Sequence, residues 1–218
     1  MRPPALIVIA KAPVPGRVKT RLCPPCTRWQ AAALAEAALA DTLQAVAAAR
    51  AKRRALVLEG ERGDWLPEGF DLHAQAAGGL DARLAAGFEA VGGPALLVGM
   101  DTPQLGPELL EAALAALARP GTEAVLGPAL DGGYWAIGLR RPRPAVFQGV
   151  PMSTPWTARA QRVRLRRLGI PWVELPKLRD VDNFEDALEV AEACPGSRFA
   201  REVESVAAAL AAAASPAG

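Results

Sequence analysis

Short apolar runs alternate with helix-forming segments along most of the chain, and this alternation constrains the fold more than any other feature. The runs at residues 5–10 and 94–99 are apolar throughout, as central strands of a parallel sheet are. Further strands are expected at 54–59, 70–74, 124–127, 134–139 and 171–175. Helices are expected at 27–51, 80–91, 107–118, 154–169 and 183–193, and in the Ala-rich stretch that follows. Together they predict a three-layer α/β fold with a mostly parallel sheet.

The predicted elements follow one another without an internal repeat or a linker. The 218 residues are enough for one α/β domain with a substantial core. We therefore expect a single domain over residues 1–214, with residues 215–218 as a frayed tail.

Charge is unevenly distributed along the chain. The net charge is only +2, which does not favour nucleic acid as a partner. Residues 1–35 and 140–168 nevertheless contain basic residues and no acidic ones, which suggests a small anionic ligand. Many of the arginines in the second stretch are expected on a solvated helix face.

The ends and apolar stretches of the chain indicate a cytoplasmic protein. No apolar run approaches the roughly 20 residues of a membrane span, and the N-terminus lacks a signal-peptide pattern. Nothing in the sequence indicates an oligomeric state.

A basic loop, residues 11–22, follows the first predicted strand. It contains Lys11, Gly16, Arg17, Lys19 and Arg21, but it matches neither the P-loop nor the GxGxxG pattern. If the segment is extended, Lys19 and Arg21 project the same way. A loop of this kind between a strand and a helix can bind phosphate, although it could equally be a solvated basic turn.

Two carboxylate motifs also follow predicted strands. Asp101 comes directly after the run at 94–99, where it could hold Mg²⁺ or cap the next helix. Asp131 lies in the segment Asp131-Gly-Gly-Tyr134, which is either an Asp-Gly hairpin or a substrate-binding loop. Because ligands of such sheets bind beyond the carboxyl ends of the strands, the basic loop, Asp101 and Asp131 should converge at one edge.

A third acidic motif, Asp180-Val-Asp182, precedes a predicted helix. Its carboxylates could interact with the helix dipole or supply a second metal ligand.

The cysteines do not predict a disulfide scaffold or a zinc site. Cys23 and Cys26 form one CxxC, no second CxxC exists, and the single histidine is His73. Redox use is conceivable, because the helix that follows could lower a thiol pKa. One histidine also makes a Ser-His-Asp or Cys-His catalytic set untenable.

Four motifs in a fixed order resemble a known bacterial family. They are Lys11-Ala-Pro-x-Pro-Gly-x-Val-Lys-Thr-Arg-Leu22, Gly99-x-Asp-x-Pro-x-Leu105, Gly127-Pro-Ala-x-Asp-Gly-Gly-Tyr-Trp135 and Asp180-Val-Asp182. They look like the motifs of the rSAM/selenodomain-associated transferase 1 family, which has a GT-A (nucleotide-diphospho-sugar transferase) fold. That family is similar to 2-phospho-lactate and molybdenum-cofactor guanylyltransferases. The resemblance covers residues 5 to about 190. The chain departs from the pattern at Cys23-Pro-Pro-Cys26 and at Asn183, where relatives often have Thr.

The resemblance assigns roles to individual residues. It implies nucleotide binding by Lys11, Gly16, Lys19, Arg21, Gln75 and Gly79. It implies substrate binding by Thr102, Asp131, Gly132, Gly133 and Tyr134. It implies Mg²⁺ (or Mn²⁺) ligation by Asp101 and Asp182, with catalysis resting on Lys19, Arg21 and Asp101.

The expected activity is Mg²⁺-dependent nucleotidyl transfer from a nucleoside triphosphate to a small anionic acceptor, with release of pyrophosphate. The basic loop favours this reaction, because nucleotidyltransferases need such a loop to bind a triphosphate. Glycosyl transfer from a nucleotide-sugar on the same fold is the alternative, although such enzymes typically use Asp-x-Asp where this chain has Met100-Asp101-Thr102. An inactive nucleotide-binding scaffold is a third hypothesis.

Overall fold

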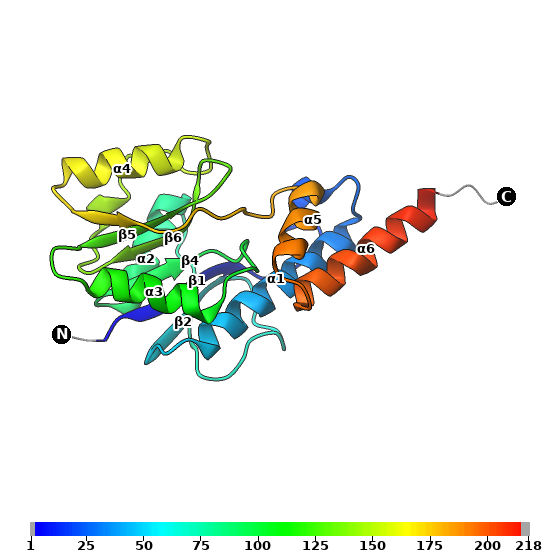
Figure 1. Cartoon of the computed structure of the whole chain (residues 1–218), viewed down its shortest axis with the longest axis horizontal. Helices are drawn as coiled ribbons and strands as arrows, with labels where there is room; N and C mark the ends of the chain where they lie inside the picture. Colours follow the sequence, from blue (N-terminus) through cyan, green and yellow to red (C-terminus); the bar gives the residue numbers. More distant parts are fainter. Residues whose placement is uncertain (1–2, 215–218) are drawn as a thin grey trace.

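The computed structural model describes residues 3–214, so the frayed tail expected at 215–218 lies outside the described residues. A seven-stranded sheet is flanked by helices (Figure 1). The strands are β1 (Ala5–Lys11), β2 (Arg53–Glu59), β3 (Asp71–Ala74), β4 (Ala95–Val98), β5 (Ala124–Pro128), β6 (Tyr134–Leu139) and β7 (Trp172–Glu174). The α-helices are α1 (Arg28–Ala48), α2 (Leu80–Val91), α3 (Pro107–Ala118), α4 (Thr157–Arg167), α5 (Phe184–Ala193) and α6 (Arg198–Ala214), and the short 3₁₀ helices are η1 (Thr20–Leu22) and η2 (Pro144–Val146).

The sheet is mostly parallel, as expected. Its order is β3-β2-β1-β4-β6-β5-β7. Among the described residues, β6 is the only strand of this sheet that runs antiparallel to its neighbours, because β5 and β6 form a hairpin. The loops after β1, β4, β5 and β7 therefore meet at one edge of the sheet.

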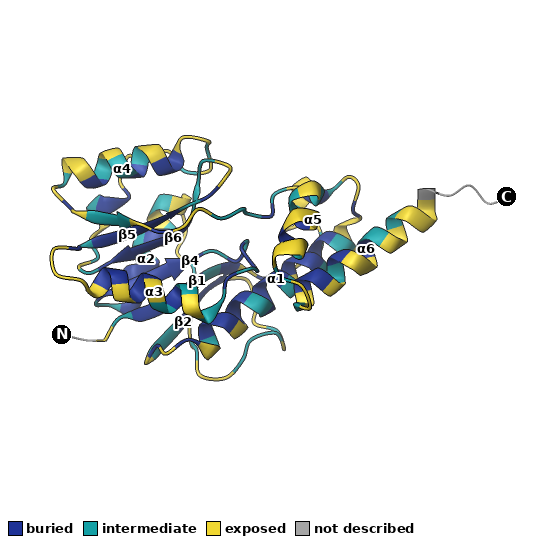
Figure 2. Ribbon diagram, viewed as in Figure 1, coloured by how far each residue is buried: buried dark blue, intermediate teal, exposed yellow. Residues whose placement is uncertain are grey.

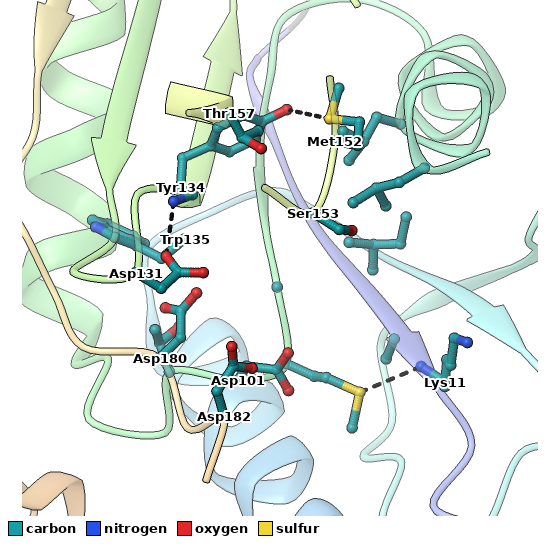
Figure 3. A pocket seen from close by; sticks show the side chains of 18 of the residues that line it. Lys11, Asp101, Asp131, Tyr134, Trp135, Met152, Ser153, Thr157, Asp180 and Asp182 are labelled. Atoms are coloured by element: carbon teal, nitrogen blue, oxygen red, sulfur yellow. Dashed lines mark hydrogen bonds between the residues drawn. The ribbon is translucent and has the colours of Figure 1, made fainter. Parts of the chain in front are cut away.

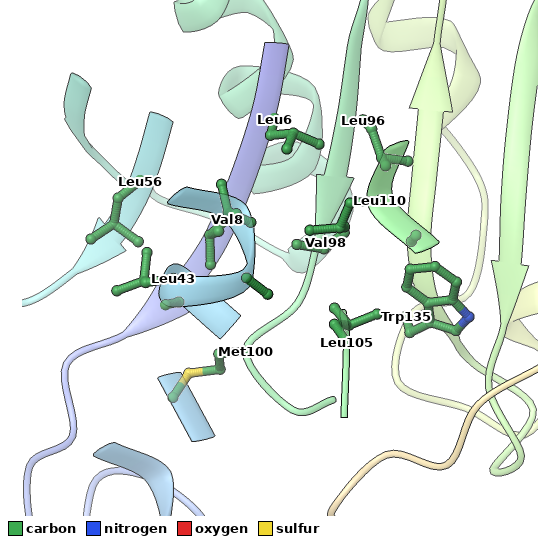
Figure 4. Packing of buried hydrophobic residues seen from close by; sticks show 14 of the residues in the cluster. Leu6, Val8, Leu43, Leu56, Leu96, Val98, Met100, Leu105, Leu110 and Trp135 are labelled. Carbon is green, nitrogen blue, oxygen red and sulfur yellow. The ribbon is translucent and has the colours of Figure 1, made fainter. Parts of the chain in front are cut away.

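Alternating side chains of β1 divide the core into two apolar layers. Leu6 and Val8 face α1 and α3 (Figure 4). Ala5 and Ile7 face α2 and α4 on the opposite side. Burial on both faces explains why β1 is almost continuously apolar, and Figure 2 shows the strands buried beneath helices with exposed outer faces.

A third cluster of apolar side chains lies at the end of the molecule formed by α5, α6 and the first half of α1 (Figure 1). Thr27 and Gln30 form a capping box at the start of α1, and the Asp41 carboxylate accepts the backbone N–H groups of Arg198 and Phe199 at the start of α6. Within residues 3–214, α1 is long and apolar enough to cross a membrane by length and composition alone. This is weak evidence for a span, because 61% of its most apolar stretch is buried in the protein.

Helix α4 begins later than predicted. Thr154 and Pro155 belong to the preceding loop, and the helix starts at Thr157. The Pro155 carbonyl lies against Gly132, where a Cβ would come within 2.0 Å of its oxygen. This tertiary contact keeps Pro155 in the loop, although Thr-Pro is a favoured helix start.

Candidate functional site

A cleft of about 720 Å³ opens at the sheet edge where these loops meet. It receives the basic loop after β1, the β4–α3 loop, the β5–β6 hairpin and the segment between β7 and α5. The convergence of the basic loop, Asp101 and Asp131 that the sequence predicts is confirmed. The volume is in the usual range for small-molecule sites.

The basic loop is not extended at Lys19, so the condition under which Lys19 and Arg21 would project the same way is not met. Lys19 has φ 50° and ψ 39°, and Thr20–Leu22 then form η1. Lys19 is drawn inward, where its ammonium donates to the Val181 carbonyl and lies 2.7 Å from Asp101 Oδ1. Arg21 remains exposed and pairs with Asp182 at 3.0 Å. The two cations thus reach the cleft through different partners and in different environments.

A second group of charged residues closes the β2 side of the cleft. Glu59 lies 3.6 Å from Lys11 Nζ and 2.5 Å from Arg83 Nη1. The side-chain amide of Gln75 donates a hydrogen bond to the Ala10 carbonyl at 2.7 Å. The amide that was expected to contact a base is therefore already hydrogen-bonded within the protein. Arg83 lines the cleft but was not identified from the sequence, because an arginine in the first turns of a helix has no distinctive pattern.

Four carboxylates gather on the opposite side. Asp131, Asp180, Asp101 and Asp182 lie near one another and line the cleft (Figure 3). Asp101 does not cap α3, since Gly106 is the N-cap residue. Within the described chain, Asp180 Oδ1 is buried without a hydrogen-bond partner. Burial raises the pKa of Asp180 to about 8; the carboxylates of Asp101, Asp131 and Asp182 also raise it, while Lys19 opposes the shift.

The acidic segment is fixed by backbone contacts. The Val181 N–H donates to the Asp101 carbonyl at 3.0 Å, while Leu178 pairs with Pro128 and Leu130. Asn183 caps α5 with help from Asp186, so Asp180 and Asp182 are not needed for that role. This arrangement places both carboxylates at the cleft, although the sequence alone made Asp182 the stronger candidate.

The predicted hairpin at Asp131 is present, and the same loop lines the cleft. Asp131 Oδ1 accepts the Gly133 N–H at 2.8 Å. Gly132 has φ +92° and packs against Pro155, so it supports the loop and is not among the lining residues. The Tyr134 hydroxyl contacts Met152 Sδ at 3.7 Å (Figure 3), and burial raises its pKa well above the usual range.

The remaining predicted site residues differ in position. Thr102 is 1% exposed, and its hydroxyl is buried without a partner among the described residues. Gly16 and Gly79 do not line the cleft: Gly16 packs against Arg28, and Gly79 is the N-cap residue of α2. The lining residues from the predicted set are Lys11, Lys19, Arg21, Gln75, Asp101, Thr102, Asp131, Gly133, Tyr134 and Asp182.

The donor set suits a hard divalent cation that a ligand helps to bind. Carboxylate oxygens are the ligands that Mg²⁺ takes in proteins, and Asp180 Oδ1, near Asp101, has no hydrogen-bond partner within the described chain. No three metal-binding side chains within the described chain are grouped so that they could hold a metal ion by themselves. A cation here would therefore need oxygens from a phosphate ligand or water as well.

Comparisons with known proteins define the family. Residues 31–154, more than half of the chain, match the family described as an uncharacterized protein conserved in bacteria (DUF2064). The chain belongs to the DUF2064 family. No curated protein matches this DUF2064 chain significantly.

Solved structures define the fold. A protein from Desulfovibrio desulfuricans G20, provisionally described as a nucleotide-diphospho-sugar transferase, is 26% identical, with TM-score 0.83 and coverage of 95% of this chain and 97% of that one. A cytidylyltransferase from Leptospira borgpetersenii serovar Hardjo-bovis is 12% identical, with TM-score 0.56 and coverage of 97% and 96%. A CMP:2-keto-3-deoxy-manno-octonic acid synthetase in complex with CTP is 12% identical, with TM-score 0.55 and coverage of 96% and 99%. The expected nucleotide-diphospho-sugar transferase fold is confirmed.

Proposed function

We propose that this DUF2064 protein is a Mg²⁺-dependent nucleotidyltransferase that acts on a nucleoside triphosphate and a small anionic acceptor. The observation that carries the proposal is the meeting of the basic loop with the four carboxylates in one cleft. Phosphoryl chemistry needs cations beside the phosphates and carboxylates that can hold a metal ion. The fold relatives include a cytidylyltransferase and a synthetase that holds CTP.

In the proposed reaction an acceptor oxygen attacks the α-phosphorus, and the bond to the β-phosphate oxygen breaks to release pyrophosphate. Lys19 would contact the donor phosphates from its inward position, and Arg21, at the rim of the cleft, would neutralise part of the negative charge of these phosphates. Asp101 with Asp180 or Asp182 would hold Mg²⁺, which supplies positive charge against the phosphate oxygens. Asp131 and Gly133 would bind the acceptor.

The finer assignments belong to the same proposal. We place the chain in the rSAM/selenodomain-associated transferase 1 family, with the base near Gln75 and the Gly78-Gly79 turn. Arg83 joins this region, because its guanidinium lies 3.4 Å from Gln75 Oε1.

Glycosyl transfer from a nucleotide-sugar is the second candidate. It is favoured by the provisional description of the Desulfovibrio protein, which is similar along nearly its whole length. The two reactions differ in the bond that breaks. Glycosyl transfer makes the whole nucleoside diphosphate the leaving group.

A ligand panel tests these proposals. We expect nucleoside triphosphates with MgCl₂ to raise the melting temperature of the protein, and one of them to release pyrophosphate when small phosphorylated or carboxylated acceptors are supplied. Stabilisation by nucleotide-sugars alone would exclude nucleotidyl transfer, and no response to any nucleotide would exclude both reactions.

The matched variants are Asp101→Asn and Asp71→Asn. Asp71 is exposed at the start of β3 and lies outside the cleft. Only Asp101→Asn should abolish the Mg²⁺-dependent part of the shift. An equal loss in both variants would mean that the metal ion does not bind at Asp101.

A further inference from the structure

The Cys23–Cys26 pair is not used by the proposed reaction, yet it adjoins the loop that carries Lys19 and Arg21. Cys23 and Cys26 are both free thiols. They line one cavity of about 540 Å³ together with Pro15, Thr27, Arg28 and Trp29. The cavity therefore lies between the basic loop and the first turn of α1, and both cysteines contribute to its lining.

The two thiols differ in exposure. Cys26 is 4% exposed and belongs to the helical cluster, whereas Cys23 is half-buried at its margin. Burial raises the pKa of Cys26, and the Cys23 thiol raises it further. The lowering of a thiol pKa that the following helix could have produced is not found at Cys26, whose pKa is raised. Cys23 is the more accessible sulfur, and Cys26 is placed to react with it second.

Backbone hydrogen bonds connect the pair to the cleft. The Cys23 N–H donates to the Thr20 carbonyl at 3.2 Å, and the Cys26 N–H donates to the Leu22 carbonyl at 2.9 Å. The Leu22 N–H in turn donates to the Lys19 carbonyl at 3.0 Å. Any rearrangement at the two cysteines therefore acts on the turn that orients Lys19.

A packing contact links the pair to the acidic side. Leu22, Cys26 and Val181 belong to one apolar cluster. Val181 lies between Asp180 and Asp182, accepts the Lys19 ammonium through its carbonyl, and donates its N–H to Asp101. The buried thiol is thus packed in the same cluster as the residue that joins the two charged sides of the cleft.

We propose that Cys23 and Cys26 form a reversible disulfide whose state controls the geometry of Lys19 and hence donor binding. The Cys23 thiolate attacks a small anionic disulfide of the glutathione class, forms a mixed disulfide and releases one thiol. The Cys26 thiolate then displaces the second thiol and closes the Cys23–Cys26 bond. Overall the protein dithiol is oxidised and the small disulfide is reduced to two thiols. Arg28, in the same cavity, supplies a positive partner for the incoming carboxylates.

Disulfide closure requires the two Cβ atoms to lie about 3.5–4.5 Å apart. Once closed, the bond holds the turn from Cys23 to Cys26 in one geometry, and the backbone of this turn is hydrogen-bonded to Thr20 and Leu22 of η1. We expect this constraint to alter the support of Lys19. Because coupling through packed networks is typically worth a few kcal/mol or less, we expect donor affinity to fall by about 2- to 30-fold on oxidation.

The first test does not depend on the proposed function. The full chain is equilibrated with oxidised and reduced glutathione, and the masses of its peptides are measured. We expect a two-hydrogen loss in the peptide that contains Cys23 and Cys26, reversed by dithiothreitol. Cys23→Ser and Cys26→Ser should abolish it, whereas Cys194→Ser should not. A stable glutathione adduct without closure, or no reaction, would overturn the proposal.

The second test measures the coupling. Amide hydrogen exchange of Leu22 and Val181 should be faster in the oxidised protein, and nucleotide affinity should be lower and recover on reduction. Disulfide formation with unchanged exchange and unchanged affinity would refute control of the site. If exchange changes but neither form binds a nucleotide, the nucleotidyltransferase proposal fails while the structural coupling stands.

Discussion

The basic loop presents its cations from one irregular segment between β1 and α1, whereas the carboxylates opposite come from the ends of β4, β5 and β7. Three cations of the basic loop, Lys11, Lys19 and Arg21, already have acidic partners. On the acidic side, Asp180 Oδ1 has no hydrogen-bond partner in the described chain. The cations of the basic loop are therefore paired more completely than the carboxyl groups on the acidic side.

This difference suits the basic loop to phosphate binding and the acidic side to cation binding. Lys11 and Arg21 can exchange an internal carboxylate for a ligand phosphate, because ion pairs near the surface contribute little net stability. The acidic side contains charge that a bound cation would compensate. A donor arriving with its metal ion would satisfy both sides at once, and each prediction below changes one side only.

Replacement of Lys19 by Met should have the largest effect. The substitution retains most of the apolar stem and removes the buried ammonium that contacts Val181 and Asp101. Loss of a charged hydrogen bond typically costs about 1.5–3 kcal/mol, so we expect a loss of that size in nucleoside triphosphate binding, measured by calorimetry. Lys177→Met, at an exposed position, is the control. Equal affinities in the two variants would exclude Lys19 from the donor site.

Replacement of Asp180 by Asn should have the opposite effect on stability. It removes a buried carboxyl group whose Oδ1 has no hydrogen-bond partner and whose pKa is raised to about 8. Because that raised pKa lowers stability at every pH above the unfolded value of about 4, we expect the metal-free protein to gain about 1–3 kcal/mol at pH 7. Stabilisation by MgCl₂ should decrease in the same variant. Urea titrations with and without the metal measure both changes.

Asp186→Asn is the matched control for Asp180. Asp186 pairs with Arg179 at 2.8 Å and helps cap α5, so its replacement should lower stability and leave the response to MgCl₂ unchanged. A loss of stability in Asp180→Asn would contradict the idea that the acidic side is under-compensated.

Replacement of Arg21 by Ala should have the smallest effect. Arg21 is 72% exposed and its partner Asp182 is 37% exposed, so the pair should contribute about 0–1 kcal/mol to folding. We expect unchanged stability, with a modest loss of nucleotide affinity that diminishes as salt concentration rises. Lys11→Ala, which breaks an exposed pair with Glu59, is the comparison. A larger loss of affinity than in Lys19→Met would reverse the ranking of the two cations.

Local patterns predicted most of the fold. Helices α2 and α3 begin and end where their apolar spacing and flanking glycines indicate, and the capping box fixed the start of α1. The start of α4 was wrong, because a contact between Gly132 and Pro155 overrides a local helix signal. The full strand order was not accessible either, since it depends on pairing between distant segments.

The sequence motifs identified which residues lie at the cleft, but they did not predict the conformation and burial of those residues. Strand ends placed Asp101 and Asp131 correctly at the cleft. The turn at Lys19 was missed because its backbone conformation is imposed by contacts with Val181 and Asp101 rather than by its neighbours in sequence. Burial, which distinguishes Asp180 from Asp182, depends on how the segment after β7 crosses the sheet edge.

Lys19 and Ser153 are the non-glycine residues in the described chain with positive φ, at 50° and 56°, and both line the cleft. For such residues the left-handed conformation costs about 1 kcal/mol or more, whereas glycine adopts it freely. At position 153 selection for thermostability alone would therefore favour glycine, whereas at position 19 the buried contacts of the Lys19 ammonium with Val181 and Asp101 oppose it. A library sorted for stability should enrich glycine at position 153 and retain lysine at position 19.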